Sequence, residues 1–152
     1  MTTPTDVAGL EPRAIMQMSR AGLDELFRKS PPGPVPVGRA RGTAIVLPGS
    51  ALDGVVAELI RALVWKGKVF SPETGDLRNL IGPLGWHLIR ARVYEDQSWF
   101  ASGRAIILDY SRTSFVARKI RDEIRLVRPG LYLGQVYWGK SRIALFMLEF
   151  PQ

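Results

Sequence analysis

The sequence contains no cysteine and a single histidine, His87. Without cysteine the chain cannot build a disulfide framework, a zinc ribbon, an iron–sulfur site or a thiol nucleophile. With one imidazole and no thiolate, a nitrogen- or sulfur-rich transition-metal site is also disfavoured, and a haem would depend on His87 alone. We therefore expect a protein that uses neither a metal nor a cofactor.

Several motifs and long runs are also missing. No apolar run approaches the roughly 18 residues of a membrane-spanning helix, and the N-terminal stretch lacks the basic start and apolar core of a signal peptide. The Gly-rich phosphate loops and the G-x-S-x-G nucleophile elbow are absent, which leaves a nucleotide loop of known kind or a Ser-His-Asp triad without support. We expect a cytoplasmic protein with no membrane span.

The composition that is present fits one globular domain. The chain has 152 residues, of which 46% are hydrophobic. A chain of this length buries roughly 68–70% of its unfolded surface, so it needs neither disulfides nor a metal ion to hold its fold. The net charge of +7 raises nucleic acid or an acidic membrane surface as a partner. The 21 basic residues are scattered, however, with no run of three, so solvated charge is the favoured interpretation and nucleic acid the less favoured one.

Two helical regions and a proline-rich linker are predicted. Residues 11–29 predict one broken helix or two short ones, with Pro12 in a first turn and Ser19 capping a second segment. Residues 30–38 hold four prolines, which favour an extended linker. Residues 52–64 place their apolar side chains at helical spacing and predict an amphipathic helix.

Short segments separated by Gly, Pro, Asp and Ser predict strands. Their turn signals recur at roughly the 8–12-residue spacing of sandwiches and barrels. Residues 114–123 suit either a helix or a strand. A hairpin through Gly139-Lys140 is expected to join the last two strands. The expected strands are residues 39–47, 66–70, 77–81, 86–94, 98–102, 104–110, 122–127, 131–138 and 142–150.

The last expected strand, residues 142–150, is apolar on both faces and must therefore be covered on both sides. The helix at 52–64 is one candidate cover, and the inside of a curved sheet is the other. We predict an α+β fold with a small antiparallel β-barrel or strongly curved sheet of about eight strands. Residues 1–37 would form an N-terminal helical segment with the linker, and residues 38–152 the barrel domain.

Three stretches resemble a known family when they are taken together and in order. They are residues 38–42 (GRARG), 65–70 (WKGKVF) and 122–125 (DEIR). They resemble the calycin-like proteins of unknown function named for a GXWXG motif, in which a W-x-G-K-x-F stretch and a D-x-F-R stretch follow. Ala40 stands at the Trp of the first motif and Ile124 at the Phe of the third. The resemblance implies a barrel of the lipocalin or fatty-acid-binding-protein type and brings no established activity.

The charged stretch RDEIRLVR at residues 121–128 contains the most informative carboxylate. In a strand, Asp122 shares a face with Ile124 and Leu126, while Arg125 lies on the opposite face. The apolar pair should face the interior and carry Asp122 with it. We expect an Arg or Tyr to pair with Asp122, because an unpaired buried carboxylate would exceed a domain's marginal stability. A structural ion-pair network and a polar cluster at a ligand site both stay open.

Other polar and aromatic residues are candidates for a site. His87 is either a hydrogen-bonded core histidine or an acid–base group. Lys66 and Lys68 share a strand face and are either solvated or an anchor for a ligand carboxylate or phosphate. The candidate catalytic residues are Asp122, His87, Glu149 and Asp109, and the candidate ligand-binding residues are Trp65, Lys66, Lys68, Trp86, Tyr110, Arg125, Tyr132 and Gln135.

The leading hypothesis is a protein that binds a small, largely apolar molecule, neutral or anionic, in a barrel cavity where a few polar groups orient it. The alternative is a cofactor-independent enzyme of the isomerase, cyclase or dehydratase type in the same cavity, with a carboxylate or His87 as acid or base. A nucleic-acid-binding module is a third hypothesis. The expected partner is a small lipophilic molecule, and a homodimer is left open.

Overall fold

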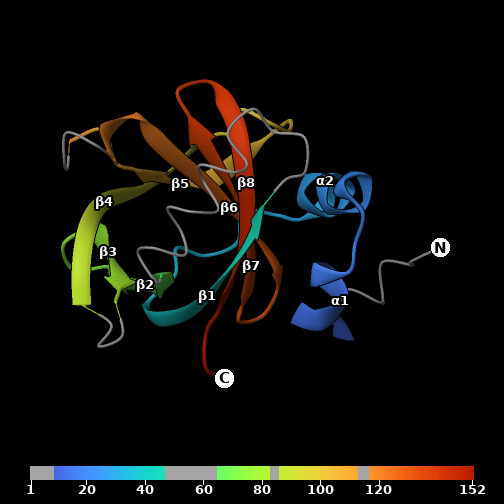
Figure 1. Cartoon of the computed structure of the whole chain (residues 1–152), viewed down its shortest axis with the longest axis horizontal. Helices are drawn as coiled ribbons and strands as arrows, with labels where there is room; N and C mark the ends of the chain where they lie inside the picture. Colours follow the sequence, from blue (N-terminus) through green and yellow to red (C-terminus); the bar gives the residue numbers. More distant parts are fainter. Residues whose placement is uncertain (1–8, 47–64, 83–85, 113–116) are drawn as a thin grey trace.

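The chain forms a closed antiparallel β-barrel with two helices against its outer face (Figure 1). The computed structural model describes residues 9–46, 65–82, 86–112 and 117–152; within these ranges the side chains of Val46, Trp65, Trp86, His87 and Leu88 are not described. Each strand pairs with the next along the chain, and β8 pairs with β1. The strands are β1 (Gly38–Val46), β2 (Trp65–Ser71), β3 (Asp76–Ile81), β4 (Trp86–Gln97), β5 (Arg104–Asp109), β6 (Ile120–Arg128), β7 (Leu131–Trp138) and β8 (Ser141–Glu149).

The observed strands confirm the predicted fold class and all but one of the expected strands. Residues 98–102 form a loop, and the prediction of a strand there is wrong. The Oγ of Ser98 accepts hydrogen bonds from the backbone N–H groups of Phe100 and Ala101, so these groups are satisfied locally instead of by a neighbouring strand. The ambiguous stretch contains a short 3₁₀ helix, η2 (Ala117–Lys119), directly before β6.

The predicted hairpin between β7 and β8 is confirmed. Trp138 pairs with Ser141 and Val136 with Ala144. Gly139, at the turn, has a φ of 61°, which is the left-handed region that glycine adopts without strain.

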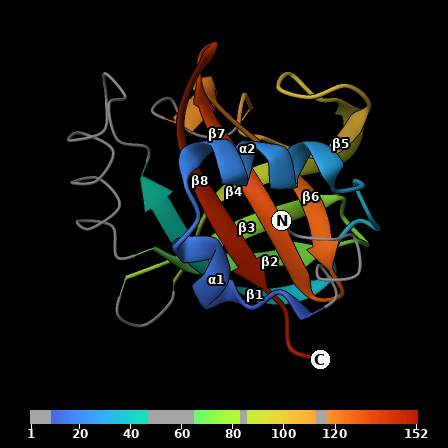
Figure 2. The same ribbon diagram turned by 90° about the vertical axis from the view of Figure 1, so that its right-hand side faces the viewer.

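The expected break in the N-terminal helical region is also confirmed. Helix α1 (Pro12–Met16) begins at a proline, and α2 (Arg20–Lys29) begins after Ser19, whose Oγ accepts a hydrogen bond from the N–H of Gly22 at 3.0 Å. Figure 2 shows α2 lying across the outer face of β7 and β8. Leu23, Leu26 and Phe27 of α2 pack there against apolar side chains of these strands.

Both faces of β8 are covered, as expected for a strand with apolar side chains on both faces. Phe146 and Leu148 point into the barrel, while Leu145 and Met147 point outwards against the helical layer. The cover that the structure shows is thus α1 and α2; the predicted helix at 52–64 lies outside the described residues. Burial on both sides explains why the strand lacks the apolar–polar alternation of a half-exposed strand.

The proline-rich residues 31–37 close one end of the barrel. The hydroxyl of Tyr132 donates to the carbonyl of Pro34 at 2.7 Å, and the N–H of Leu126 donates to the carbonyl of Pro31 at 2.8 Å. Pro36 is buried in this region, and the cavity between it and Phe70 measures only about 10 Å³. Within the described residues this end is therefore packed.

Candidate functional site

Four polar side chains lie together inside the otherwise apolar barrel. Lys68 comes from β2, Asn79 from β3, Tyr110 from the residue after β5, and Asp122 from β6. Lys68, Tyr110 and Asp122 are each 3% exposed and Asn79 is 5% exposed. The prediction that Asp122 faces the interior is confirmed. Of the two expected partners, Arg or Tyr, it is a tyrosine, Tyr110, that hydrogen-bonds to Asp122, and its charged partner is Lys68, which was not expected in that role.

Lys68 is at the centre of this interior cluster. Its Nζ donates to Asn79 Oδ1 at 2.8 Å and to Tyr110 Oη at 2.6 Å, and it lies 3.3 Å from Asp122 Oδ2. These three acceptors match the three hydrogens of an ammonium group. The centroid of the Phe146 ring lies 5.3 Å from Nζ, a distance at which an aromatic face stabilises a cation.

Gly134 is what allows Phe146 to reach this position. A Cβ on Gly134 would lie 2.3 Å from Cζ of the Phe146 ring, far inside van der Waals contact. The absence of a side chain on β7 therefore makes room for the ring on the neighbouring strand, and the ring in turn lies over the Lys68 ammonium.

The hydrogen bonds fix the direction of the Tyr110 hydroxyl. Its oxygen accepts from Lys68 Nζ and, at 2.9 Å, from Asn79 Nδ2, so two donors face its two lone pairs. Asn79 is itself oriented by a second bond, from Nδ2 to the carbonyl of Ile89 at 2.9 Å. A hydrogen bond between the Tyr110 hydroxyl and Asp122 lowers the pKa of that carboxyl, against the larger effect of burial, which raises it.

Burial shifts the proton affinities of all three titratable groups. It raises the pKa of Tyr110 and of Asp122, and for Asp122 the nearby Lys68 only partly opposes this effect. Burial alone would lower the pKa of Lys68, but the neighbouring Tyr110 and Asp122 outweigh it and raise that pKa. With Lys68 Nζ only 3.3 Å from Asp122 Oδ2, the two groups have the geometry of a buried ion pair.

One carboxylate oxygen of the cluster has no hydrogen-bond donor among the described residues. Asp122 Oδ2 faces Lys68, but no donor in the described part of the chain reaches the buried Oδ1. Buried polar atoms in folded proteins are almost always hydrogen-bonded, and exceptions call for an explanation such as a bound molecule. Asp122 Oδ1 is therefore the point of the interior cluster from which a ligand could be held.

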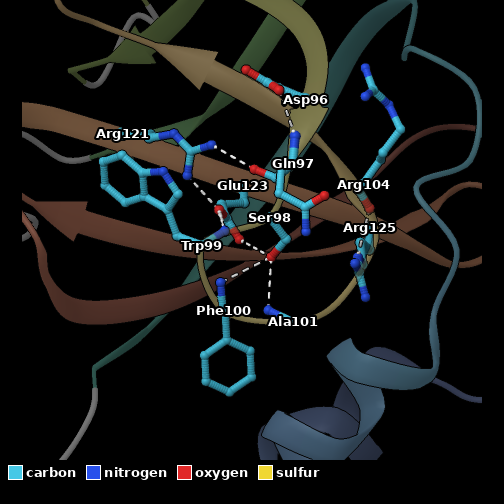
Figure 3. A network of polar contacts seen from close by, with 10 residues as sticks. All are labelled: Asp96, Gln97, Ser98, Trp99, Phe100, Ala101, Arg104, Arg121, Glu123 and Arg125. Carbon is cyan, nitrogen blue, oxygen red and sulfur yellow. Dashed lines mark hydrogen bonds and ion pairs between the residues drawn. The ribbon is translucent and has the colours of Figure 1, made fainter.

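The outer face of β6 carries a second polar network, which fixes the 98–103 loop (Figure 3). Glu123 is fully buried and accepts from Ser98 Oγ at 2.7 Å, from the N–H of Trp99 at 2.6 Å and from Arg121. The guanidinium of Arg121 lies 3.9 Å from the centroid of the Trp99 ring. Each carboxylate oxygen has protein donors, so this network is structural.

Two of the sequence candidates also lie outside the barrel, under α2. Arg125 donates to four backbone carbonyls, two of them at the C-terminal end of α2 and two in or beside the 98–103 loop. Burial lowers its pKa, and Glu123 opposes this shift. Gln135 accepts from Arg142 at 2.9 Å, and Arg142 in turn pairs with Asp24 of α2. The structure thus separates Arg125 and Gln135 from the interior cluster.

The remaining described candidates are dispersed. Asp109, half-buried on β5, accepts from Tyr94 Oη and from the N–H of Ser111, both at 2.9 Å. Burial would raise its pKa, but these hydrogen bonds outweigh it and lower the pKa. Lys66 and Glu149 line a cleft of about 650 Å³ on the surface, together with Arg39 and Arg41. Tyr132 points inwards, where it fixes residues 31–37.

Lys66 and Lys68 were expected on the same face, and a β-bulge separates them. The pairing of β2 with β3 shifts between Trp65 and Gly67, which makes Lys66 an extra residue. Gly67 has a φ of 145° and packs so closely on β1 that a Cβ there would lie 2.0 Å from the carbonyl oxygen of Ala40. As a result Lys66 is exposed while Lys68 is buried.

Some candidates cannot be placed, and one residue was missed. The side chains of His87, Trp65 and Trp86 lie outside the described ones. Asn79 was not predicted, although it is the one polar residue between Leu77 and Leu80 that falls on the apolar face of its strand. Asn79 alternates with Leu77 and Ile81 along the strand, and this alternation would have predicted that its side chain points inwards.

The described residues show neither a metal-binding group nor a membrane-spanning helix. No set of three or more His, Asp or Glu side chains in the described ranges is arranged to hold a metal ion. Among the same residues no helix combines the length and apolar character needed to cross a bilayer.

Comparison with known proteins supports the fold and does not indicate an activity. No family model and no curated protein matches the sequence. The crystal structure of a protein from Thermomonospora curvata is similar to this chain, with a TM-score of 0.65 and 25% sequence identity over 89% of each chain. Its description gives the source organism and no function.

Proposed function

We propose that the protein binds a small, largely apolar molecule inside the barrel. The observation that carries this proposal is the interior cluster of Lys68, Asn79, Tyr110 and Asp122, which is buried among apolar side chains. Within the described ranges no donor reaches Asp122 Oδ1. A mostly apolar lining with a few converging polar groups is the usual composition of small-molecule sites. The resemblance to calycin-like GXWXG proteins supports the same interpretation, because such barrels enclose ligands.

A purely structural role would explain this arrangement less well. A buried ion pair rarely stabilises a protein more than apolar residues of the same volume would. The chain nevertheless places a lysine and an aspartate in the barrel and surrounds them with oriented hydrogen bonds. Strongly perturbed groups gathered at one point are a feature of functional sites.

The structure favours a neutral ligand over an anionic one at this cluster. Lys68 already faces the Asp122 carboxylate at 3.3 Å, so the pair carries no net charge with which to attract an anion. A ligand carboxylate close to Asp122 Oδ1 would meet a like charge in a medium of low dielectric constant. The exposed basic residues that could attract an anion, Arg39, Arg41 and Lys66, are in the surface cleft instead.

Ligand binding inside the barrel can be tested with the purified full-length protein. We expect native mass spectrometry to detect one small molecule bound per chain, and we expect the extracted protein to bind the neutral fluorophore N-phenyl-1-naphthylamine with enhanced emission. Ala91→Phe, which places a ring in the interior, should abolish binding, whereas Arg41→Glu in the surface cleft should leave it unchanged.

Two results would contradict the proposal. One is the absence of both a bound mass and fluorophore binding. The other is loss of binding in Arg41→Glu but not in Ala91→Phe, which would place the ligand on the surface. Because added volume in a core can cost about 1–3 kcal/mol, the melting curve of Ala91→Phe is recorded, and Ala91→Val serves as a milder variant that should weaken binding in the same direction.

A cofactor-independent enzyme is a second candidate, and it is favoured by the three titratable groups within hydrogen-bond reach of one another. Asp122 would remove the proton from the carbon next to a ketone carbonyl. The C–H electron pair would become the C=C bond of an enolate while the π pair of the carbonyl moves to its oxygen, and Tyr110, polarised by Lys68, would donate its hydrogen bond to that oxygen instead of to Asp122. Exchange of the proton on Asp122 with water before its return to the same carbon would give hydrogen exchange, and its return to a different carbon of a conjugated enolate would give an isomerisation.

Hydrogen exchange into a ketone checks this candidate. In deuterated water containing 2-decanone, we expect the protein to catalyse incorporation of deuterium next to the carbonyl, as seen by NMR. Asp122→Asn should abolish the catalysis, and Tyr110→Phe should slow it by about 10²-fold or more, as loss of one hydrogen-bond donor to a developing oxyanion does elsewhere. Exchange no faster than in buffer would exclude this proton-transfer chemistry.

A further inference from the structure

The hydrogen-bond geometry inside the barrel specifies the head group of the ligand. We infer that the interior site selects molecules whose polar end is a neutral hydrogen-bond donor, such as the hydroxyl of an aliphatic alcohol, and that this donor binds Asp122 Oδ1. The inference rests on the proposed function, since it concerns the ligand of the same interior cluster. It adds a chemical class that a mainly apolar interior alone would not define.

The first argument is the direction of the donors in the cluster. Lys68 directs its ammonium at Asn79, Tyr110 and Asp122 Oδ2. Asn79 directs its amide nitrogen at Tyr110 and at the Ile89 carbonyl. These hydrogen bonds point the donors at acceptors within the barrel wall, and the acceptor of the cluster that they do not reach is Asp122 Oδ1. What a ligand can add here is a donor.

The second argument is charge. A carboxylate oxygen accepts hydrogen bonds and, when ionised, cannot donate one. An ether, ester or ketone oxygen directed at Oδ1 is only an acceptor, so in that orientation it would leave Oδ1 unpaired and lie against a negative charge. A carboxylate ligand would add a second negative charge. An ammonium ligand would bring a full positive charge beside Lys68, which lies 3.3 Å from the other oxygen of the same carboxylate. A neutral hydroxyl avoids all three conflicts.

The third argument is the surroundings of Asp122. The side chain is 3% exposed and lies among the apolar interior residues, with Ile124 next to it on the same face of β6. In such a medium a hydrogen bond to a charged acceptor is strong, because water does not compete for the acceptor. The rest of the ligand should therefore be a hydrocarbon, and its single donor should decide which molecule binds.

A matched pair of ligands tests the inference: 1-decanol and decyl methyl ether, which share the ten-carbon chain and differ in the donor, with decanoate as the charged comparison. Calorimetry or displacement of N-phenyl-1-naphthylamine gives the affinities. For the full-length protein we expect 1-decanol to bind at least about tenfold more tightly than the ether, which corresponds to one hydrogen bond to a charged acceptor. Decanoate should bind more weakly than the alcohol.

Variants at Asp122 should remove the preference and leave the apolar part of binding in place. Asp122→Asn exchanges the charged acceptor for an amide, so the alcohol and the ether should differ by less than about threefold. Because this variant leaves the Lys68 charge without its carboxylate, Lys68→Met/Asp122→Leu provides a second version without either charge. The ether should bind both variants at least as tightly as it binds the parent protein, because neither variant places a carboxylate against the ether oxygen.

The outcomes separate the inference from the function on which it depends. If none of the three compounds binds the full-length protein, the proposed function fails and the inference fails with it. If the compounds bind and the ether has the same affinity as the alcohol, Oδ1 accepts a hydrogen bond from water and not from the ligand. The inference then fails, while ligand binding stands. If the alcohol is preferred and both variants keep that preference, another residue selects the donor, and the assignment to Asp122 is overturned.

Discussion

Lys68→Met should lower the free energy of unfolding by about 3–5 kcal/mol, the range observed when one partner of a buried ion pair is removed. Methionine preserves most of the apolar volume, so the loss reports on the charge and its hydrogen bonds. Asp122 would keep a buried carboxylate without its cation, and Tyr110 and Asn79 would each lose a bond to Nζ. Denaturant unfolding followed by tryptophan fluorescence measures the change.

Two comparisons isolate the cause. Lys66→Met makes the same chemical change on the same strand but at an exposed side chain, and surface substitutions usually stay within about 0.5 kcal/mol. Lys68→Met/Asp122→Leu removes both charges and should recover most of the loss, because an apolar pair can replace a buried ion pair at little or no cost. A double variant as unstable as the single one would show that packing, not charge, is responsible.

The loss of unfolding free energy in Lys68→Met should also depend on pH, and the direction of this dependence follows from the pKa of Asp122. This loss is called the deficit below. Burial raises the pKa of Asp122, and Lys68 is a main influence that lowers it, so removing Lys68 raises the folded-state pKa further above its unfolded value. A carboxyl with a raised folded-state pKa contributes stability when protonated and loses that contribution as the pH rises through the folded-state pKa. The deficit should therefore be greatest near neutral pH and shrink on acidification towards about pH 4. A deficit that grows in acid would contradict this assignment.

Arg125→Met should have the second large effect, although Arg125 lies outside the barrel. Its guanidinium donates to the carbonyls of Phe27 and Arg28 at the end of α2 and to those of Ser102 and Arg104 in and beside the 98–103 loop. Each carbonyl left without a donor in a buried setting costs about 1–3 kcal/mol. We expect a total loss of at least about 3 kcal/mol in denaturant unfolding, since several carbonyls lose their donor at once.

The geometry of the guanidinium, and not only its charge, carries this expectation. Arg125→Lys keeps the charge but replaces the planar fork of donors by a single ammonium, which cannot reach all four carbonyls, so it should recover less than half of the loss. Arg104→Met is the matched control, because Arg104 is half-exposed and its ion pair with Glu95 lies on the surface. An Arg125→Met protein within about 1 kcal/mol of the parent would show that water replaces the guanidinium.

The alternation of side chains between the two faces of a strand was the most reliable guide to the candidate site. It placed Asp122 with Ile124 inside the barrel and Arg125 outside, as the structure shows. It failed at Lys66, because a bulge adds one residue to β2 and ends the alternation there. The bulge depends on the close contact of Gly67 with β1, a strand far away in the sequence, and a local pattern carries no information on such a contact.

The outer cover of the barrel could not be predicted for a related reason. Gln135 was a candidate for the interior, yet it points outwards with Leu131 and Leu133, beneath α2. On β7 both faces are apolar enough to be buried, so the pattern does not say which face meets the helices. Asp24 of α2 and Arg142 of β8 pair with each other over Gln135, and only the folded chain brings these residues together.

The pairing of β8 with β1 determines what an unfinished chain looks like. The first strand of the barrel is synthesised early and its closing partner, the nine residues of β8, is synthesised last. Until β8 is added, β1 and β7 each present a row of unpaired N–H and C=O groups along one side. Such edge strands are templates on which other chains add and aggregate. A chain that ends before Ser141 therefore carries two unpaired strand edges that can pair with other chains, and the addition of β8 removes both.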